Sequence, residues 1–132
     1  MPEYLSIATH ERIEMISIGS LLAELLRKKA DAGWKDGFLA VYDAAAAPVR
    51  ATAPPLRPVF ECFLADRVPQ DWGFRHAEGN SDAHIKTSIF GSSVLVPVAG
   101  GLPDLGQWQA VYLCESDGPR VRTLRVSFLK EA

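Results

Sequence analysis

The closing segment of the chain, residues 120–129, alternates between polar and apolar side chains. Successive side chains of a β-strand point to opposite faces, so this pattern predicts a strand with one face on the protein core. The apolar members are Val121, Leu124, Val126 and Phe128, and the polar members are Arg120, Arg122, Arg125 and Ser127. The alternation slips at Thr123, which is consistent with a β-bulge. Such a strand needs partner strands elsewhere in the chain.

Short apolar runs supply those partners. Further strands are predicted over residues 4–8, 12–18, 37–43, 94–98 and 108–115. The first two are expected to form a hairpin around Thr9-His10-Glu11, and Asp117-Gly118 predicts a hairpin turn into the closing strand. Prolines at positions 48, 54, 55 and 58 disfavour regular structure through residues 48–58.

Helical patterns lie between the terminal strands. Helices are predicted over residues 20–32, 59–67 and 82–90. Ser20 is the expected cap of the first, and Asn80 or Ser81 caps the last, while Gly33 and Gly91 are expected to end these two helices. Strands at both ends with helices between them predict a single-domain α+β fold with a mainly antiparallel sheet.

Charge and composition exclude several classes of function. The chain of 132 residues carries 14 Lys and Arg against 16 Asp and Glu, a formal charge of −2, so no general affinity for nucleic acid or an anionic membrane is expected. Its apolar runs are too short to cross a membrane, and no signal peptide is recognisable. Cys62 and Cys114 predict buried, reduced thiols, as in a cytoplasmic protein.

The chemically richest segment is residues 76–86, which holds two of the three histidines of the chain. His76 and His84, with an oxygen from Glu78 or Asp82, could bind a divalent metal such as zinc or manganese. Alternatively, one of the histidines acts as a general acid or base, because imidazole exchanges protons near neutral pH. The spacing of the two residues does not decide between these roles.

The helix predicted from residue 82 places Asp82 with Lys86 and His84 with Ser88 in two adjacent rows. The N-terminal turn of this helix and Lys86 together predict an anion site, suited to a phosphate group. The alternative interpretation is an ordinary surface ion pair between Asp82 and Lys86.

A second candidate group lies at residues 108–120. Trp108 is expected in the core, and Asp117-Gly118-Pro119 has the composition of a turn. Glu115, at the end of the predicted strand, is the candidate functional residue of this group.

Four ordered motifs carry a resemblance to a known family. They are His-x-x-x-Asn-x-Asp-x-His-x-Lys at 76–86, Gly-Ser-Ser-Val-Leu-Val-Pro-Val at 91–98, Leu-Gly-Gln-Trp-Gln at 105–109 and Cys-Glu-Ser-Asp-Gly-Pro-Arg at 114–120. This series resembles the YjbQ family, whose members are described as secondary thiamine-phosphate synthases. The flanking elements agree, so the resemblance extends over nearly the whole chain.

The resemblance implies a compact α+β subunit that assembles into a homotrimer, with sites near subunit interfaces. It also implies weak thiamine-phosphate synthase activity, in which a thiazole nitrogen displaces pyrophosphate from hydroxymethylpyrimidine pyrophosphate with a divalent metal (Mg, Mn or Zn) on the phosphates. The residues that match the polar site positions of the family are His76, Asn80, Asp82, His84, Lys86 and Glu115.

The chain departs from the family after the strand at 37–43. Where relatives typically carry His-Thr-Thr-Ala, this chain has Asp43-Ala44-Ala45-Ala46. In one interpretation the site is rebuilt, with Asp43 as an oxygen ligand and Arg50 or Arg57 holding phosphate. In the other, the chain has lost the reaction and is a binding or scaffolding protein, because removing a ligand or proton-transfer group costs orders of magnitude in rate.

Overall fold

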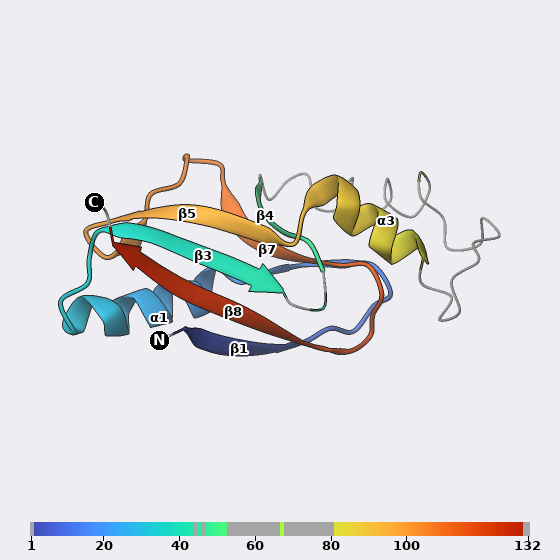
Figure 1. The fold of residues 1–132 in the computed structure, drawn as a ribbon, viewed down its shortest axis with the longest axis horizontal. Coiled ribbons are helices and arrows are strands. Elements are labelled where there is room, and N and C mark those ends of the chain that lie inside the picture. The colour runs from blue at the N-terminus through green and yellow to red at the C-terminus, as the bar shows by residue number, and fades with distance from the viewer. Residues whose placement is uncertain (1, 44, 46, 53–66, 68–80, 131–132) are drawn as a thin grey trace.

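The computed structural model describes residues 2–43, 45, 47–52, 67 and 81–130 (Figure 1). The chain runs through β1 (Glu3–Ala8), β2 (Glu14–Ser17), α1 (Gly19–Asp31), β3 (Gly37–Asp43), β4 (Val49–Thr52), α3 (Ser81–Phe90), β5 (Ser93–Ala99), β6 (Leu102–Pro103), β7 (Ala110–Glu115) and β8 (Val121–Lys130). The predicted α+β class is confirmed.

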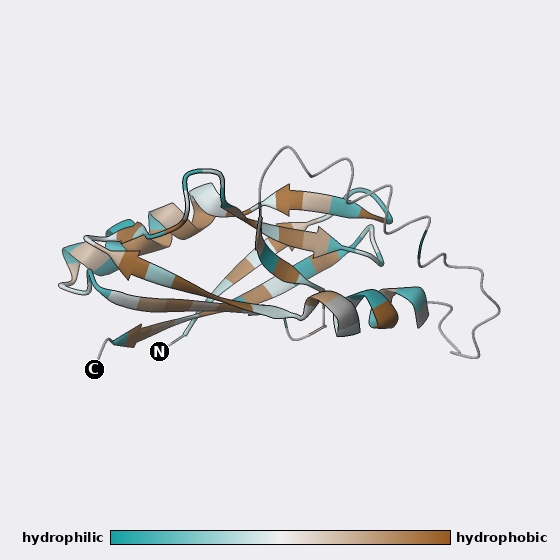
Figure 2. Cartoon of the chain, turned by 90° about the horizontal axis from the view of Figure 1, so that it is seen from above, coloured by the Kyte–Doolittle hydropathy of each residue, from teal (hydrophilic) through white to brown (hydrophobic). Residues whose placement is uncertain are grey.

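The strands form two antiparallel sheets. The larger sheet has the order β1-β8-β3-β5-β6 and the smaller one has the order β2-β7-β4. Both sheets and α1 contribute to one hydrophobic core, with Leu124 from the larger sheet, Leu113 from the smaller sheet and Leu22 from α1. Figure 2 shows hydrophobic and polar residues alternating along the strands, as expected when one face of a sheet is buried.

Core packing sets the start of α1. The predicted cap at Ser20 is wrong, because the helix already begins at Gly19 and Ile18 occupies the cap position without a side-chain hydrogen bond. Ile18 is buried and its backbone N–H donates to the carbonyl of Val111 at 3.1 Å. The predicted end is confirmed: Gly33 has a φ of 99°, a left-handed conformation that glycine adopts without strain.

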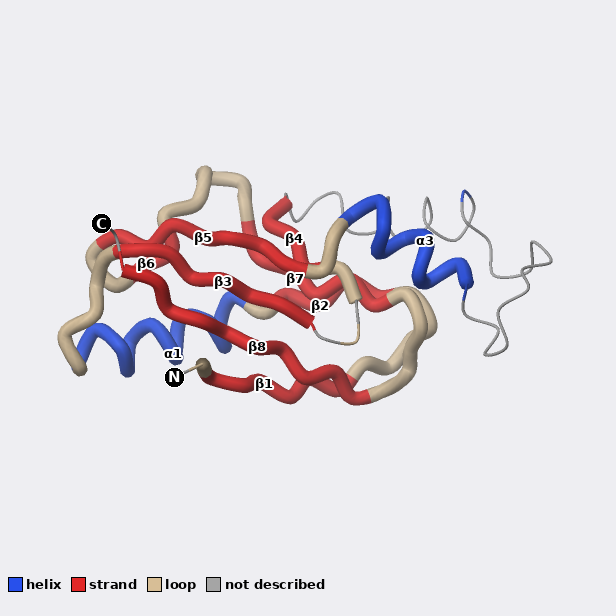
Figure 3. The backbone as a smooth tube through the Cα atoms, viewed as in Figure 1, coloured by secondary structure: helices blue, strands red, loops and turns tan. Residues whose placement is uncertain are grey.

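Neither predicted hairpin forms. β1 pairs with β8 and β2 pairs with β7, so the 9–13 and 116–120 connections both cross from one sheet to the other. The two crossings lie side by side at the same end of the molecule (Figure 3), where Gly118 N–H donates to the carbonyl of Arg12 at 3.1 Å. Turn residues indicate a reversal of the chain, but they do not determine which strand pairs with which.

The closing strand has no bulge. Its register with β1 is continuous, with Ser6 opposite Thr123 and Ile7 opposite Arg122. The inward-facing residues are therefore Arg122, Leu124 and Val126, and Val121 points to solvent. The sequence pattern was misleading here because a buried arginine occupies an inward position that hydrophobic periodicity assigns to an apolar residue.

Other predictions had mixed outcomes. The strand at Gly37–Asp43 is confirmed, as is the helix ending at Phe90 before Gly91. Trp108 is 71% exposed, so its predicted core position is wrong. β4 forms within the segment expected to be irregular, because residues 49–52 pair with β7.

The helix predicted over residues 59–67 lies outside the described residues except for Arg67, and Cys62 also lies outside them. Cys114 is buried, as predicted. Among the described residues, no helix is both long and apolar enough to cross a membrane.

Candidate functional site

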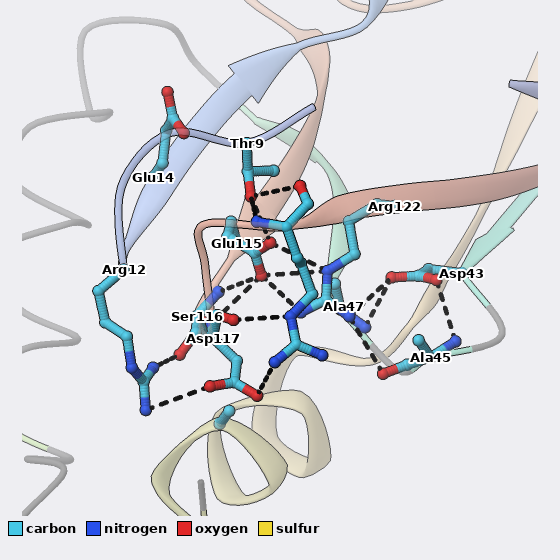
Figure 4. Close-up of polar contacts among 12 residues, drawn as sticks. Thr9, Arg12, Glu14, Asp43, Ala45, Ala47, Glu115, Ser116, Asp117 and Arg122 are labelled. Atoms are coloured by element: carbon cyan, nitrogen blue, oxygen red, sulfur yellow. Dashed lines mark hydrogen bonds and ion pairs between the residues drawn. The ribbon is translucent and has the colours of Figure 1, made fainter. Parts of the chain in front are cut away.

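Polar side chains gather where the two sheet crossings meet the first turn of α3. They come from the 9–13 connection, the end of β7 and the start of β8 (Figure 4), and from α3. Two groups can be distinguished. One surrounds Glu115 and Arg122, and the other surrounds Asp82.

Glu115 and Arg122 form a buried ion pair with 0% and 4% exposure. Arg122 Nη2 lies 2.5 Å from Glu115 Oε2, and Arg122 Nε lies 3.0 Å from Oε1. Thr9 Oγ1 donates to Oε1 at 2.8 Å, and the backbone N–H groups of Ser116 and Asp117 donate to Oε2. The pair therefore joins both crossings between the sheets.

These contacts keep Glu115 ionised. Burial by itself disfavours the carboxylate, but the hydrogen bonds and charge of Arg122, with the hydrogen bond from Thr9, lower the pKa of Glu115. The same pairing outweighs burial at Arg122 and raises its pKa. A carboxylate held in this way is a poor proton donor at neutral pH, so the geometry favours a structural role for Glu115 over the predicted catalytic one.

Asp43 is buried at the end of β3 and closes the turn that follows it. Its Oδ1 accepts the backbone N–H of Ala45 at 3.0 Å, and its Oδ2 accepts that of Ala47 at 3.0 Å. Arg122 Nη1 lies 3.8 Å from the same Oδ2. Both carboxylate oxygens are engaged within the chain, an arrangement that favours a turn-forming role for Asp43 over the predicted role as a metal ligand.

Asp82 and Lys86 lie on the inner face of α3, each only 1% exposed. Lys86 Nζ lies 2.8 Å from Asp82 Oδ2, and Arg12 Nη2 lies 3.0 Å from Oδ1. The interpretation as an ordinary surface pair is therefore wrong. Burial opposes ionisation of Asp82, but the hydrogen bond and charge of Lys86, together with Arg12, outweigh it and lower its pKa.

Arg12 connects this pair to the other crossing. Its Nη1 donates to the carbonyl of Ser116, and its Nη2 lies 3.5 Å from Asp117 Oδ1. Arg120 in turn lies 2.7 Å from Asp117 Oδ2. Among the described residues, this group holds three cations (Arg12, Lys86 and Arg120) and two carboxylates (Asp82 and Asp117). The adjoining group holds Arg122 with Glu115 and Asp43, so the two groups together carry no net charge.

His84 and Ser88 occupy the opposite, exposed face of α3, where Ser88 Oγ donates to the backbone carbonyl of His84 at 2.9 Å. The structure therefore separates His84 from Lys86, which points inward. His76 and Asn80 lie outside the described residues. Arg50 is exposed on β4, opposite Tyr112 in the strand register.

The described residues by themselves form no site for a divalent metal. In this part of the chain no three His, Cys, Asp or Glu side chains are placed to share an ion. Asp82, the nearest oxygen ligand in sequence to His84, already contacts two cations, which would repel a metal ion. A site that uses His76 with His84 stays a prediction.

Sequence reasoning missed Thr9, Arg12 and Arg122 as members of these groups. Arg122 could have been noticed as a charged residue in a strand otherwise rich in apolar residues, a position that requires a buried partner. No pattern in the neighbouring sequence identifies Arg12 as a site residue, because its partner Asp82 is 70 positions away in the chain.

Comparisons with known proteins point to one family. The family described as UPF0047 protein YjbQ-like matches residues 3–131. A UPF0047 protein of Methanocaldococcus jannaschii is 34% identical over 127 residues, which cover 93% of this chain and 90% of that protein. One from Methanothermobacter thermautotrophicus is 34% identical over 128 residues, covering 93% and 87%.

Solved structures agree with the sequence match. A hypothetical protein from Aeropyrum pernix has a TM-score of 0.89 and 28% identity, with 99% of each chain covered. A YjbQ/UPF0047 protein from Clostridium acetobutylicum has a TM-score of 0.87 and 30% identity, with 96% of this chain and 99% of that chain covered. The chain therefore belongs to the UPF0047 (YjbQ-like) family.

Proposed function

We propose that this protein binds a phosphorylated or otherwise anionic small molecule where α3 meets the two sheet crossings. The observation that carries the proposal is the convergence of Arg12 and Lys86, from two separate elements of the chain, on a single carboxylate. Arginine and lysine from separate elements can grip the oxygens of a phosphate in the same way. Arg12 is 28% exposed, so the group is open to solvent on one side.

Roles for the remaining predicted residues follow from this placement. Arg12 and Lys86 hold the anion, and the first turn of α3 adds its backbone N–H groups. His84 lies on the exposed face of α3 and serves as an acid or base toward a ligand part outside the anion group. His76, Asn80 and a divalent metal complete the site in this proposal, and Arg50 contacts the ligand from β4.

We further propose that thiamine-phosphate synthase activity is weak or lost. The support is Asp43, which stands where relatives typically carry a histidine and whose oxygens are held by the backbone of residues 45 and 47. An acceptor fixed in this way is poorly suited to replace an imidazole and two hydroxyls. The protein then acts as a binding member of its family.

A homotrimer that serves as a non-enzymatic scaffold is the second candidate. The outer face of the larger sheet supports it, because neither α1 nor α3 covers this face in Figure 1 and large apolar side chains lie on it. These exposed residues include Tyr4, Tyr42, Leu95, Val121 and Leu129. On the outward positions of β1, β8, β3 and β5, Arg125 is the single charged residue. Such a face suits a second copy of the chain.

Calorimetric titration with pyrophosphate tests the binding proposal. Heat of binding is expected for the natural chain and is expected to disappear in the Lys86→Met variant. Lys28→Met, which removes an exposed lysine of α1, is the matched control and should bind normally. Equal binding by all three proteins would show that Lys86 does not contribute to pyrophosphate binding.

A synthase assay tests the enzymatic alternative. The pure protein is mixed with hydroxymethylpyrimidine pyrophosphate, thiazole phosphate and magnesium, and thiamine phosphate is measured against a variant that combines His76→Ala with His84→Ala. We expect no excess product from the natural chain. Clear product that depends on these histidines would show that the reaction survives without the His-Thr-Thr segment.

A further inference from the structure

The proposed anion site already contains an anion of its own. Asp82 presents one carboxylate oxygen to Lys86 at 2.8 Å and the other to Arg12 at 3.0 Å. Both cations thus contact the same carboxylate. A ligand phosphate that used Arg12 and Lys86 would need the positions that these two oxygens occupy.

Burial makes this arrangement costly as a purely structural device. Asp82 and Lys86 are both 1% exposed, and taking two charges out of water costs several kcal/mol per ion before their attraction offsets it. Apolar side chains of similar size could fasten α3 to the body at no such cost. A buried pair of this kind can serve structure or recognition, and the neighbouring contacts decide between them.

A second observation at the same place points to a ligand. The hydroxyl of Ser116 is buried, with the residue only 2% exposed, and has no hydrogen-bond partner among the described residues. Its own carbonyl accepts the hydrogen bond from Arg12 Nη1. Buried polar groups are rarely left unsatisfied, so the hydroxyl of this residue, whose carbonyl contacts Arg12, is available to donate a hydrogen bond.

We infer, on the basis of the proposed function, that Asp82 is an internal counter-anion which the ligand displaces from Arg12 and Lys86. Ser116 then donates a hydrogen bond from its hydroxyl to the bound ligand. Asp82 thereby selects for charge. A monoanionic carboxylate only replaces one like group by another and gains little. A phosphoryl group with two negative charges attracts both cations more strongly and can compete.

The test compares inorganic phosphate with acetate by calorimetry on the natural chain and on Asp82→Asn, which removes the charge but keeps the size. The natural chain should bind phosphate and give no signal with acetate. Asp82→Asn should bind phosphate about tenfold more tightly or better and should gain binding to acetate. Ser116→Ala should weaken phosphate binding and leave the preference between the two anions unchanged.

The outcomes separate the two proposals. If neither protein binds phosphate or pyrophosphate, the proposed function fails. If the natural chain binds phosphate and Asp82→Asn binds it equally or less tightly, the internal counter-anion is disproved and the proposed function stands.

A measurement on the natural chain covers the case in which Asp82→Asn does not fold. The carbon-13 signal of the Asp82 carboxylate is followed by NMR while phosphate is added. Displacement predicts a change in its chemical shift that saturates together with phosphate binding. An Asp82 signal that stays constant at saturating phosphate would overturn the inference.

Discussion

Arg122 Nη2 lies 2.5 Å from Glu115 Oε2 in a place where neither residue is open to solvent. Glu115 ends β7 in the smaller sheet and Arg122 lies near the start of β8 in the larger sheet. The ion pair therefore connects the two sheets where the chain crosses between them. Thr9, at the other crossing, donates to the same carboxylate. The position of both crossings depends on this pair.

Removing one partner of this pair should destabilise the fold severely. Arg122→Met leaves Glu115 buried without its counter-charge, a loss of about 3–5 kcal/mol in the free energy of unfolding. Urea unfolding followed by circular dichroism measures it. The matched control is Arg125→Met, which changes an exposed arginine of the same strand and should shift stability by less than about 0.5 kcal/mol. Similar losses in both variants would contradict the importance of the pair.

Stability should fall in acid because two buried carboxylates must be protonated. The pKa of Asp82 lies below its ordinary value of 3.8 and that of Glu115 lies below 4.5. The folded state then binds fewer protons than the unfolded state, so the stabilisation is complete above these ordinary values and is lost as the pH falls through the lower folded values.

Urea unfolding at about pH 7, 5, 4 and 3 checks this prediction. The free energy of unfolding is expected to change little between the first two and to drop in the last two. In Asp82→Asn, which cannot be protonated at this position, the drop should be smaller. If the free energy of unfolding falls equally in acid for this variant and the natural chain, Asp82 does not contribute to the acid sensitivity.

Gly118 should tolerate no side chain. A Cβ at this position would lie 2.1 Å from the carbonyl oxygen of Glu11 in the neighbouring crossing, so Gly118→Ala must push the two crossings apart. We expect a loss of about 1–3 kcal/mol, as in other overpacked sites. Gly19→Ala is the control, because its Cβ would meet only Ser17 Oγ at 3.8 Å. A melting temperature unchanged in Gly118→Ala would contradict the close contact.

Asp43 should be important for stability rather than for metal binding. Asp43→Ala removes the acceptors of the Ala45 and Ala47 N–H groups and one carboxylate near Arg122, and a loss of about 1–3 kcal/mol is expected. Asp43→Asn keeps one acceptor oxygen and should lose less. Thermal unfolding with and without added magnesium measures both effects. A metal-dependent stabilisation that Asp43→Ala abolishes would instead support the role as a metal ligand.

The elements with strong local patterns could be predicted from the sequence. β3 and α3 were placed nearly to the residue, because an uninterrupted apolar run and a helix that stops at Gly91 are features of short segments. The strand pairing could not be predicted, since hairpin signals at residues 9–11 and 117–118 look the same when the chain changes sheet.

The candidate site was likewise predictable only where it depends on local sequence. The helical spacing of Asp82 and Lys86 was visible in the sequence, and the contact exists. Its burial and its third member, Arg12, depend on the folding together of segments distant in sequence. The inward orientation of Arg122 could not be predicted either. Hydrophobic periodicity assigns only apolar residues to inward positions, and the partner of Arg122 comes from the other sheet.

Assembly provides the last test. If a second copy covers the outer face of the larger sheet, Leu95→Glu places an uncompensated charge in an apolar contact and should convert the expected homotrimer into monomers. Mass photometry is too coarse for a 14.4 kDa chain, so light scattering coupled to size exclusion is the suitable measurement. Trp108→Glu is the control, since Trp108 is also exposed but precedes β7 of the smaller sheet. A trimer that persists in Leu95→Glu and dissociates in Trp108→Glu would move the interface to the smaller sheet.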